Sequence, residues 1–585
     1  MNAYSVAERA TMQSFMNCFL REAKAVDRAL YDEKELIISL QHQQVKLFIP
    51  IKYWSKTGRH LFDFPAFYQL SEQGEKLELD FNTLVSLVSK ELSHQFQSNK
   101  ENQVELIARV IQSYQLIVQI IEERFEDQGE LYDEDFTFIE AEQSLIFGHL
   151  LHPTPKSRQG FSEEDIEHYS PELKGSFALH YFRVPLSLIK ESSTLEKNAN
   201  QLIKDMVLED PFIGEDFKHF YAKEDEYALI PLHPWQAQYV KKNPYINKLI
   251  TENVIEDLGQ AGRPFFPTSS LRTVYHPEVP FMFKFSLNIK ITNSVRANLL
   301  KELERGVEVT KLMEGNLGGE IEQRFSNFSI VTDPAYITLN LKGMKETGFE
   351  VILRENPFMN EAASKVTPIA ALCQDKIEGR GSRLSSIIHG IAEQENKSVT
   401  EISEAWFEQY LDISFEPMMW LYLQRGIALE AHQQNSVVSL TDEGYPKHFY
   451  YRDNQGYYYC ESKKEELKKL LPNISTKSET ICADRVADER LRYYLFYNHL
   501  FGIINAFGTG NLIEEEKLLV ILKNRLSKIS INKNHPSNLV NSLLNDEEIA
   551  CKANLLTRFH DMDELVGAME TQSVYVPIKN PLIIR

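Results

Sequence analysis

The stretch from Pro267 to Arg296 constrains the fold of this chain most, because its second half alternates in polarity. The odd positions from 281 to 289 are Phe, Phe, Phe, Leu and Ile, and the even positions from 282 to 290 are Met, Lys, Ser, Asn and Lys. A period of two places these two sets on opposite faces of a β-strand. The sequence therefore predicts a half-buried strand over 281–290 with a polar, partly cationic face that carries Lys284 and Lys290.

A helix is expected after this strand. Three candidate N-caps are followed by apolar residues at helical spacing: Thr292, Asn293, Ser294, then Val295, Leu299, Leu300 and Leu303. Arg296 would then lie at the positive end of the helix dipole, where an anion is favoured and a cation is not. An anion bound beside Arg296 would resolve this conflict. The alternative is an ordinary amphipathic strand with exposed cations.

The segment before the strand can bind the same kind of anion. It carries three hydroxyls and one guanidinium within five positions: Ser269, Ser270, Arg272 and Thr273. Hydroxyl groups donate to phosphate or carboxylate oxygens, and arginine can do so through two parallel hydrogen bonds. The whole stretch therefore predicts an anion site.

Charge and cysteine usage narrow the classes of function. The 585 residues include 63 basic and 84 acidic ones, a net charge of −21, which argues against nucleic acid or an anionic membrane surface as a partner. The five cysteines are scattered without a CxxC pair, so neither a disulfide framework nor a thiolate zinc site is predicted. No leader or bilayer-spanning apolar run is recognised, and a cytoplasmic location is expected.

The length predicts two to four domains or subdomains. A mostly helical first region, with helices expected near 81–92 and 104–125, ends in an acidic segment before residue 137. The second region, to about residue 380, mixes strands with Pro-interrupted loops, and the third is helix-rich, with helices expected at 401–413, 417–428 and 491–505. Within the third region, Tyr-rich segments on both sides of Asn454-Gln455-Gly456 predict a β-hairpin over 447–462.

A Pro-interrupted loop offers a second group of binding residues. His149 and His152 are spaced like zinc ligands, yet no third ligand follows at metalloenzyme spacing, and Pro153 and Pro155 exclude a regular helix. Presentation of four side chains to an anion is the favoured interpretation, and a solvated surface loop is the alternative. These four are His152, Lys156, Ser157 and Arg158.

Oxygen and nitrogen ligands also gather after an apolar helix in the third region. Glu430, His432 and Asn435 lie there, and Asp453 follows Arg452 on the expected hairpin. Carboxylate oxygens suit Mg²⁺, which proteins usually hold through one or two carboxylates together with substrate phosphates. An ordinary polar helix end is the alternative.

Two absences direct the functional prediction. The sequence has neither a GxxxxGK[ST] loop nor a GxGxxG turn after a strand, and it has no GxSxG elbow. A basic, hydroxyl-rich anion site with a possible Mg²⁺ centre therefore points to nucleotide chemistry on a less familiar scaffold.

Seven motifs in order along the chain resemble the IucA/IucC family of siderophore synthetases, which work independently of non-ribosomal peptide synthetases. They are HPTPKSRQG at 152–160, LHPWQ at 232–236, PTSSLRT at 267–273, KITNSVR at 290–296, EAHQQN at 430–435, RD at 452–453 and KANLLTR at 552–558. Within the family the chain is most similar to the citrate-using type, and in particular to petrobactin-pathway members that join citrate to spermidine. The resemblance implies an α+β fold shaped like a cupped hand, with a thumb (1–136), fingers (137–380) and a palm (381–585), often as a homodimer.

The resemblance also implies roles for individual residues. The nucleotide phosphates and the carboxylate would be held by Ser269, Ser270, Arg272, Thr273, Lys284 and Arg296, and the rest of the nucleotide would contact His432, Gln434 and Asn435. Glu430 and Asp453 would hold Mg²⁺. The citrate-like acid would contact His152, Lys156, Ser157, Thr292 and Asn293. Of these residues, Arg272, Lys284, Arg296 and His432 would take part in catalysis.

The expected function is that of an ATP-dependent ligase. It would adenylate a carboxylate of citrate, release pyrophosphate, and form an amide with a primary amine of a polyamine or diamine. Three alternatives stay open: the same chemistry with an amino acid or a hydroxamate-bearing amine, a non-catalytic citrate- or nucleotide-binding protein, and a zinc hydrolase at His149 and His152.

Overall fold

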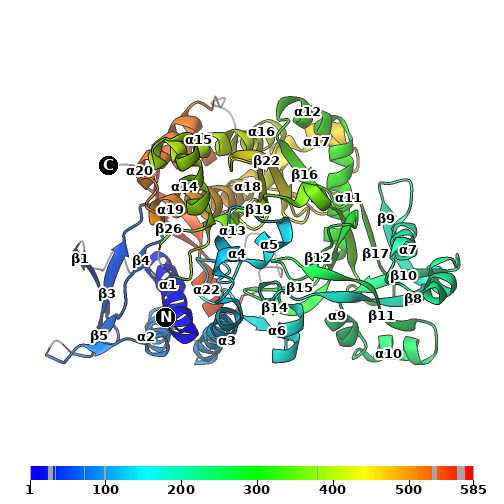
Figure 1. Ribbon diagram of the computed structural model, residues 1–585, viewed down its shortest axis with the longest axis horizontal. Coiled ribbons are helices and arrows are strands. Elements are labelled where there is room, and N and C mark those ends of the chain that lie inside the picture. The colour runs from blue at the N-terminus through cyan, green and yellow to red at the C-terminus, as the bar shows by residue number, and fades with distance from the viewer. Residues whose placement is uncertain are drawn as a thin grey trace.

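The computed structural model describes residues 2–23, 30–32, 34–71, 73–97, 100–378, 380–529, 536–562 and 573–583. In Figure 1 the N-terminal part lies at the lower left, the strands that follow lie at the lower right, and the helices of the C-terminal part extend across the top. These three parts correspond, in this order, to the ranges expected for the thumb, the fingers and the palm.

The N-terminal part packs three helices against a small sheet with strand order β1-β2-β3-β5-β6, and β4 pairs with β3. Its elements are α1 (Ala3–Glu22), β1 (Leu30–Asp32), β2 (Glu35–Leu40), β3 (Val45–Tyr53), β4 (Leu61–Phe62), β5 (Phe67–Gln69), β6 (Leu77–Glu78), α2 (Phe81–Phe96), α3 (Lys100–Arg124) and α4 (Gln128–Tyr132). Within the described ranges, α3 alone has the length and composition of a membrane-crossing helix. Its buried Leu106 and Val110 pack in one core with α1 and α2.

The middle part is built on an eight-stranded antiparallel sheet with order β10-β8-β11-β12-β13-β18-β17-β9. Its strands are β8 (Phe177–Pro185), β9 (Ile189–Ser193), β10 (Tyr227–Leu232), β11 (Glu256–Pro267), β12 (Thr273–Tyr275), β13 (Phe281–Phe285), β17 (Ala335–Leu339) and β18 (Val351–Glu355). Helices α5 (Phe138–Gln143), α6 (Glu163–Tyr169), α7 (Ala199–Glu209), α8 (Glu215–Phe217), α9 (Pro234–Val240), α10 (Pro244–Thr251), α11 (Leu300–Glu314) and α12 (Asn316–Arg324) accompany it.

The predicted strand over 281–290 is two strands that belong to different sheets. Strand β13 ends at Phe285, and β14 (Leu287–Ile291) pairs with β15 (Ser294–Arg296) and with β7 (Arg158–Gln159). The break falls at Ser286, whose backbone N–H donates to Glu350 O and whose hydroxyl bonds the Glu350 carboxylate. The apolar face is buried from Phe283 to Ile289, as the alternation predicts. The expected polar face is buried as well at Lys284 and Ser286, and the alternation could not reveal the change of sheet.

The prediction of a helix from residue 295 is also wrong. Residues 292 and 293 form a two-residue turn between the paired Ile291 and Ser294, so Arg296 lies on β15. Helix α11 begins only at Leu300. Two of the N-cap candidates, Thr292 and Asn293, form this turn, and the third, Ser294, begins β15, where the hairpin pairs its backbone with β14.

The C-terminal part is helix-rich and holds the largest core, around Trp406, Phe407, Phe449 and Phe507. Its helices are α13 (Ile369–Cys373), α14 (Arg383–Glu395), α15 (Val399–Ile413), α16 (Phe415–Arg425), α17 (Lys464–Leu470), α18 (Asp484–Leu491), the π-helix η7 (Arg492–Leu500), α19 (Phe501–Thr509), α20 (Glu515–Ser527), α21 (Leu539–Asn545) and α22 (Asn554–Phe559). Its sheets have the orders β16-β22-β21-β19, β20-β23-β24 and β25-β26. Their strands are β16 (Phe328–Val331), β19 (Val366–Pro368), β20 (Ile427–Leu429), β21 (Ser436–Leu440), β22 (Pro446–Arg452), β23 (Tyr457–Cys460), β24 (Ile481–Cys482), β25 (Glu548–Lys552) and β26 (Tyr575–Lys579).

The predicted hairpin over 447–462 is wrong. Strand β22 lies between β16 and β21, whereas β23 lies between β20 and β24, so the two strands do not pair. Both edges of β22 are occupied, and the turn at 453–456 therefore carries the chain from one sheet to the next. Asp453 starts this turn with a left-handed backbone (φ 106°).

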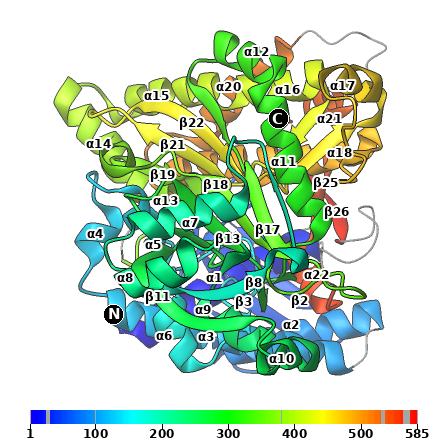
Figure 2. The same ribbon diagram turned by 90° about the vertical axis from the view of Figure 1, so that its right-hand side faces the viewer.

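Sheets and cores connect parts of the chain that are distant in sequence. Strands β16 and β19 lie within the range expected for the fingers, yet they pair with β22 and β21 of the expected palm. Helix α22 and its N-cap Ala553 contribute to the core formed by α1, α2 and the N-terminal sheet, through Ala553, Leu555, Leu556 and Phe559. Helix α22 contacts α1 and α3, and Figure 2 shows it at the lower right of the molecule. The boundary near residue 380 stays a prediction.

Candidate active site

A cavity of about 310 Å³ is lined by residues from all three parts of the chain. Every residue predicted for the site lies on its wall except Ser157, whose hydroxyl instead bonds Gln112 on α3. The lining includes nine basic residues: Arg59, Lys156, Arg158, Arg272, Lys284, Arg296, Arg354, Arg452 and Lys552. It includes three acidic ones, Glu172, Glu430 and Asp453. The cavity is therefore a local concentration of positive charge within an acidic protein.

Three turns that line the cavity have left-handed backbones at residues other than glycine. The φ angles are 64° at Leu271, 54° at Thr292 and 106° at Asp453. Such conformations cost of order 1–3 kcal/mol each and persist where surrounding contacts hold them, as they often do at functional sites. Leu271 N donates to Thr268 O at 2.9 Å, and Asp453 Oδ1 accepts from Gln455 N at 3.2 Å, which holds two of the turns.

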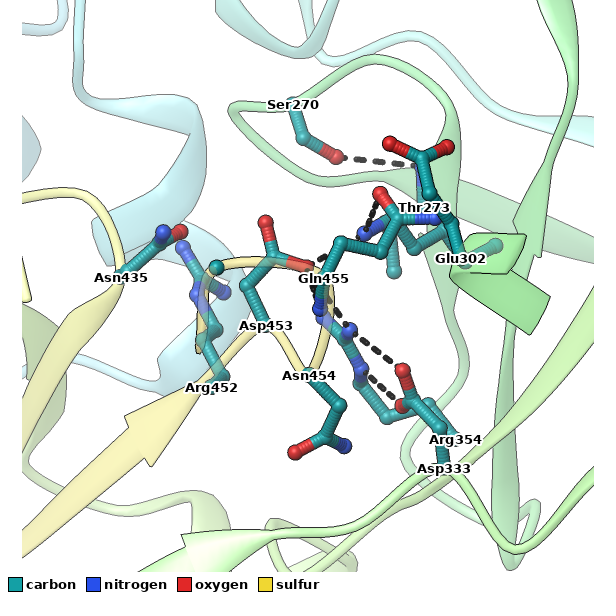
Figure 3. Close-up of polar contacts among 12 residues, drawn as sticks. Ser270, Thr273, Glu302, Asp333, Arg354, Asn435, Arg452, Asp453, Asn454 and Gln455 are labelled. Carbon is teal, nitrogen blue, oxygen red and sulfur yellow. Dashed lines mark hydrogen bonds and ion pairs between the residues drawn. The ribbon is translucent and has the colours of Figure 1, made fainter. Parts of the chain in front are cut away.

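Arg272 and Lys284 converge on the turn at 453–455. Lys284 Nζ donates to Asp453 Oδ1 at 2.6 Å and to Gln455 Oε1 at 2.7 Å, and Arg272 Nη2 donates to the same Gln455 oxygen at 2.9 Å. Arg272 Nη1 also donates to Asn298 Oδ1 at 2.8 Å. Figure 3 shows this turn opposite the loop that carries Ser270 and Thr273. The two cations are thus fixed before any ligand binds.

Burial changes the acidity of both cations. It lowers the pKa of Lys284 to about 8, although Asp453 acts in the opposite direction. Burial and the neighbouring Arg296 lower the pKa of Arg272 to about 10. Both shifts reflect the cost of holding positive charges together away from water, and a bound anion would relieve that cost.

Asp453 is the counter-charge of this group. Burial alone would raise its pKa, but Lys284 and Arg354 outweigh burial and hold the pKa of Asp453 well below its ordinary value. Arg354 is itself fixed by Asp333, with N–O distances of 2.6 and 3.0 Å. In Figure 3 one oxygen of Asp453 is turned toward Gln455, and the Arg354–Asp333 pair lies below the turn.

Arg296 reaches the cavity from the β14–β15 hairpin. Its side chain makes long hydrogen bonds to Ile291 O (3.4 Å) and to Thr292 Oγ1 (3.3 Å). Its backbone carbonyl accepts from Arg272 Nη1 at 3.1 Å. The hairpin, and not a helix terminus, places Arg296 beside Thr292 and Asn293.

His152 lies buried beside Asn293 and is neutral. Its Nδ1 accepts the backbone N–H of Thr154 at 3.1 Å, so the proton of the neutral ring is on Nε2. Burial, with the charges of Arg558 and Lys552 nearby, holds the pKa of His152 well below its ordinary value. His152 can therefore donate one hydrogen bond into the cavity.

Lys156 and Arg158 hold a buried carboxylate. Arg158 Nη2 lies 2.7 Å from both oxygens of Glu172, and Lys156 Nζ bonds the same carboxylate and the carbonyl of Leu145. Burial alone would raise the pKa of Glu172, but Arg158 and Lys156 lower it to about 2. These two cations therefore brace the loop.

The Glu172→Gln substitution should destabilise the protein by about 3–5 kcal/mol, because it leaves two buried cations without their anion. The pKa of Glu172 is lowered in the folded state, so its contribution is complete above about pH 4.3 and is lost as the pH falls toward 2. Thermal unfolding at pH 7 should show a lower Tm for Glu172→Gln than for the unaltered protein. The difference in Tm between the two proteins should be smaller at pH 3. The exposed Glu164→Gln is the matched control. An unchanged Tm for Glu172→Gln would contradict this assignment.

A ring of contacts positions the segment 430–435. Glu142 on α5 accepts from Ser269 N at 2.8 Å and pairs with Arg452 Nη1 at 2.5 Å. Arg452 donates to Gln434 O at 2.8 Å, and Gln434 Nε2 donates to Ser269 Oγ at 3.1 Å. The ring joins the 267–273 loop to the 430–435 segment across the cavity.

Glu430 and His432 lie next to each other in this segment. Burial raises the pKa of Glu430 and lowers the pKa of His432 to about 3. Glu430 Oε2 accepts from Tyr458 OH at 3.1 Å, and its backbone N–H donates to Gly456 O at 2.8 Å. The second contact ties Glu430 to the turn that begins at Asp453.

Comparisons with known proteins identify the family of this chain. A model of the IucA / IucC family matches residues 137–374, and a model described as ferric iron reductase FhuF-like transporter matches residues 404–567. A spermidine-citrate ligase of Bacillus anthracis is 45% identical over 100% of this chain and 98% of the relative. The chain belongs to the IucA/IucC family. RhbC, a rhizobactin siderophore biosynthesis protein of Rhizobium meliloti (strain 1021), is 36% identical over 100% of this chain and 98% of the relative.

Solved structures of this family have the same fold. The ATP-bound aerobactin synthetase IucA from a hypervirulent pathotype of Klebsiella pneumoniae has a TM-score of 0.88 at 27% identity, covering 98% of this chain and 99% of that one. The petrobactin biosynthesis protein AsbB from Bacillus anthracis str. Sterne has a TM-score of 0.75 at 17% identity, covering 99% and 96%, which shows the fold alone. The predicted family and the predicted α+β fold are confirmed.

The histidine pair in this IucA/IucC protein has other partners. His149 Nδ1 accepts from Leu151 N at 3.1 Å, and its Nε2 lies 3.0 Å from Asn498 Nδ2. In the described part of the chain, no group of three or more His, Cys, Asp or Glu side chains could hold a metal ion. Nothing in the geometry favours the zinc alternative.

Several lining residues were missed by sequence reasoning. Arg354 could have been found, because it directly follows the apolar run Val351–Leu353, and a buried charge requires a partner. Gln455 gave no signal, since polar residues are usual in turns. The π-helix η7 places Tyr493, Tyr494 and Asn498 on the wall, and long π-helical segments often mark functional sites.

Proposed function

We propose that this protein is an ATP-dependent siderophore synthetase that joins citrate to a primary amine of a polyamine such as spermidine. One observation carries the proposal: the cations and hydroxyls of the family motifs converge on one cavity whose charge suits two polyanions, ATP and citrate. The 45% identity to a spermidine-citrate ligase over the full length supports polyamine as the amine class.

The lining residues also fit a magnesium ion. Both oxygens of Glu172 are engaged by Arg158, and Lys156 bonds one of them. The contacts of Asp453 with Lys284 and Gln455 use only Oδ1, so Asp453 and Glu430 are the lining carboxylates with an oxygen available for a cation. Two carboxylates together with substrate phosphates are the usual way in which proteins hold Mg²⁺. When bound, Mg²⁺ would neutralise phosphate charge and favour the departure of pyrophosphate. Glu430 and Asp453 are thus the proposed ligands.

The first half-reaction brings a carboxylate to the α-phosphate of ATP, which places two anions in contact. Arg272, Lys284 and Arg296 would offset this repulsion and stabilise the charge that spreads over the phosphate oxygens. Because Asp453, Gln455 and Asn298 fix two of these cations in advance, little reorganisation is needed when the reaction occurs. The neutral His152, with Thr292 and Asn293, would hold the rest of the acid through hydrogen bonds.

The second half-reaction needs an uncharged amine next to the acyl group. The cations of the cavity repel a polyamine, whereas the remaining carboxylates of bound citrate and the phosphate of the adenylate attract it. We therefore expect the amine to bind after activation. Adenylation makes AMP the leaving group, so amide formation depends mainly on positioning and on removal of the ammonium proton.

Lys552 should bind a second carboxylate of citrate. It is buried at 6% exposure, lines the cavity, and its charge acts on His152, His432 and Glu430 together. We expect Lys552→Met to raise the KM for citrate about 10- to 100-fold, the value of one charge-assisted hydrogen bond. The KM for ATP should change much less, and equal effects on both substrates would contradict this role. Exposed Lys248→Met is the control.

A pyrophosphate-release assay with ATP and Mg²⁺ tests the whole proposal. Citrate should give turnover that rises on addition of spermidine, and mass spectrometry should detect the amide. Amino acids and hydroxamate-bearing amines are the comparison nucleophiles. If no carboxylic acid supports pyrophosphate release, or if turnover proceeds without ATP, the ligase assignment is wrong.

A further inference from the structure

Two cysteines face each other across a parallel strand pair away from the cavity lining. In the register of β23 and β24, Tyr459 is opposite Ile481 and Cys460 is opposite Cys482. Directly opposed residues on neighbouring strands lie about 4.7–4.9 Å apart in the hydrogen-bonding direction, within the Cα range of about 4.4–6.8 Å that a disulfide spans. Both cysteines are thiols in the structure.

We propose that Cys460 and Cys482 form a reversible disulfide when the protein meets hydrogen peroxide. The two positions differ in access, as a sensing and a resolving thiol should. Cys482 is half-buried on β24, which is an edge strand, whereas Cys460 is 3% exposed on the central strand β23. This difference in access determines which of the two thiols reacts with peroxide first.

Peroxide reacts first at Cys482, because Cys460 is out of contact with solvent. Burial, together with Asp484 and Cys482, raises the pKa of Cys460 well above its ordinary value, which keeps it a protonated thiol during this step. The sulfur of Cys482 attacks one peroxide oxygen, the O–O bond breaks, and water leaves with formation of a sulfenic acid. The sulfur of Cys460 then attacks that of Cys482, the S–O bond breaks, and a second water carries away the thiol proton.

The bridge would join two segments that continue into the site. Strand β23 follows the turn of Asp453 and Gln455, and it pairs with β20, which precedes Glu430. Strand β24 leads through α18 into η7, which carries Tyr493, Tyr494 and Asn498. A disulfide would fix these segments relative to each other and protect Cys482 from irreversible oxidation to sulfinic acid.

Native peroxide treatment of the full chain, followed by alkylation and peptide mapping, tests the proposal. We expect one cross-linked pair of peptides containing Cys460 and Cys482, with a mass loss of about 2 Da that a thiol reductant reverses. The buried Cys18, Cys373 and Cys551 serve as internal controls and should stay reduced.

Two variants separate the roles of the thiols. In the Cys460→Ser variant, peroxide should oxidise Cys482 to sulfinic acid without forming a cross-link. In the Cys482→Ser variant, peroxide should leave Cys460 unmodified. Because Cys460 is in the core, Cys460→Ala is the alternative if the serine variant does not fold. Sulfinic acid at Cys482 of the unaltered chain, a cross-link to another cysteine, or no modification at either residue would overturn the proposal.

Discussion

Replacing Arg296 with alanine should lower the rate of citrate adenylation by about 10²–10³-fold, the loss typical of removing one preorganised donor to a transition-state oxyanion. The fold should survive, because the hydrogen bonds of this side chain to Ile291 and Thr292 are long and its backbone contact to Arg272 does not depend on the side chain. Pyrophosphate release in the absence of amine measures the first half-reaction directly.

The control is Lys290→Ala on the same hairpin. Lys290 also carries a positive charge, but it pairs with Asp561 at 2.8 Å and does not line the cavity. Its removal should change adenylation by less than about threefold, as expected for an exposed ion pair. Adenylation at the unaltered rate in Arg296→Ala, with an unchanged Tm, would remove Arg296 from the proposed mechanism.

Replacing Asp453 with asparagine should have a comparable effect on activity and a distinct effect on its pH dependence. The substitution removes a proposed Mg²⁺ ligand, so we expect a loss of about 10² or more in rate and half-saturation at higher Mg²⁺ concentration. It also removes the charge that raises the pKa of Lys284, which is about 8 in the unaltered protein. In the variant the pKa of Lys284 is therefore lower, and its ammonium loses its proton at a lower pH than in the unaltered protein.

The pH profile of kcat/KM checks this second effect, because it reports groups of the free enzyme. Activity that needs charged Lys284 is complete below its pKa and falls as the pH rises through it. The basic limb should lie near pH 8 in the unaltered protein and move to lower pH in Asp453→Asn. The control Asp205→Asn, which breaks the surface pair with Lys197, should leave the basic limb in place. A basic limb unchanged in Asp453→Asn would contradict the role of Lys284.

The sequence predicted which residues line the cavity better than it predicted the elements that carry them. Polarity alternation gave the burial of Phe283 and Phe285 correctly, because side-chain direction depends only on local extended geometry. It placed Lys284 on the opposite, polar face, which the structure buries as well. It could not give the switch of sheet at Ser286, which depends on Glu350, sixty-four residues away. Asp453 and Gln455 illustrate the same limit, since their turn joins two sheets instead of closing a hairpin.

The cations that line the cavity show a related limit. Lys284 and Arg296 were predicted for the site from motifs, and the structure brings both to the cavity. Lys156 was predicted for the same purpose, but its ammonium pairs with Glu172, which follows sixteen residues later. Sequence patterns identify a charge, whereas its counter-charge depends on tertiary packing.

The participation of α22 in the N-terminal core has a consequence for the order of folding. Ala553, Leu555, Leu556 and Phe559 complete a core whose other buried members come from residues 12–110, and Leu556 N donates to Glu22 Oε2 at 2.9 Å. A ribosome releases the first of these segments long before the last. We therefore expect the N-terminal part to remain incompletely packed during synthesis, and to become protease-resistant only after residues 553–559 have emerged.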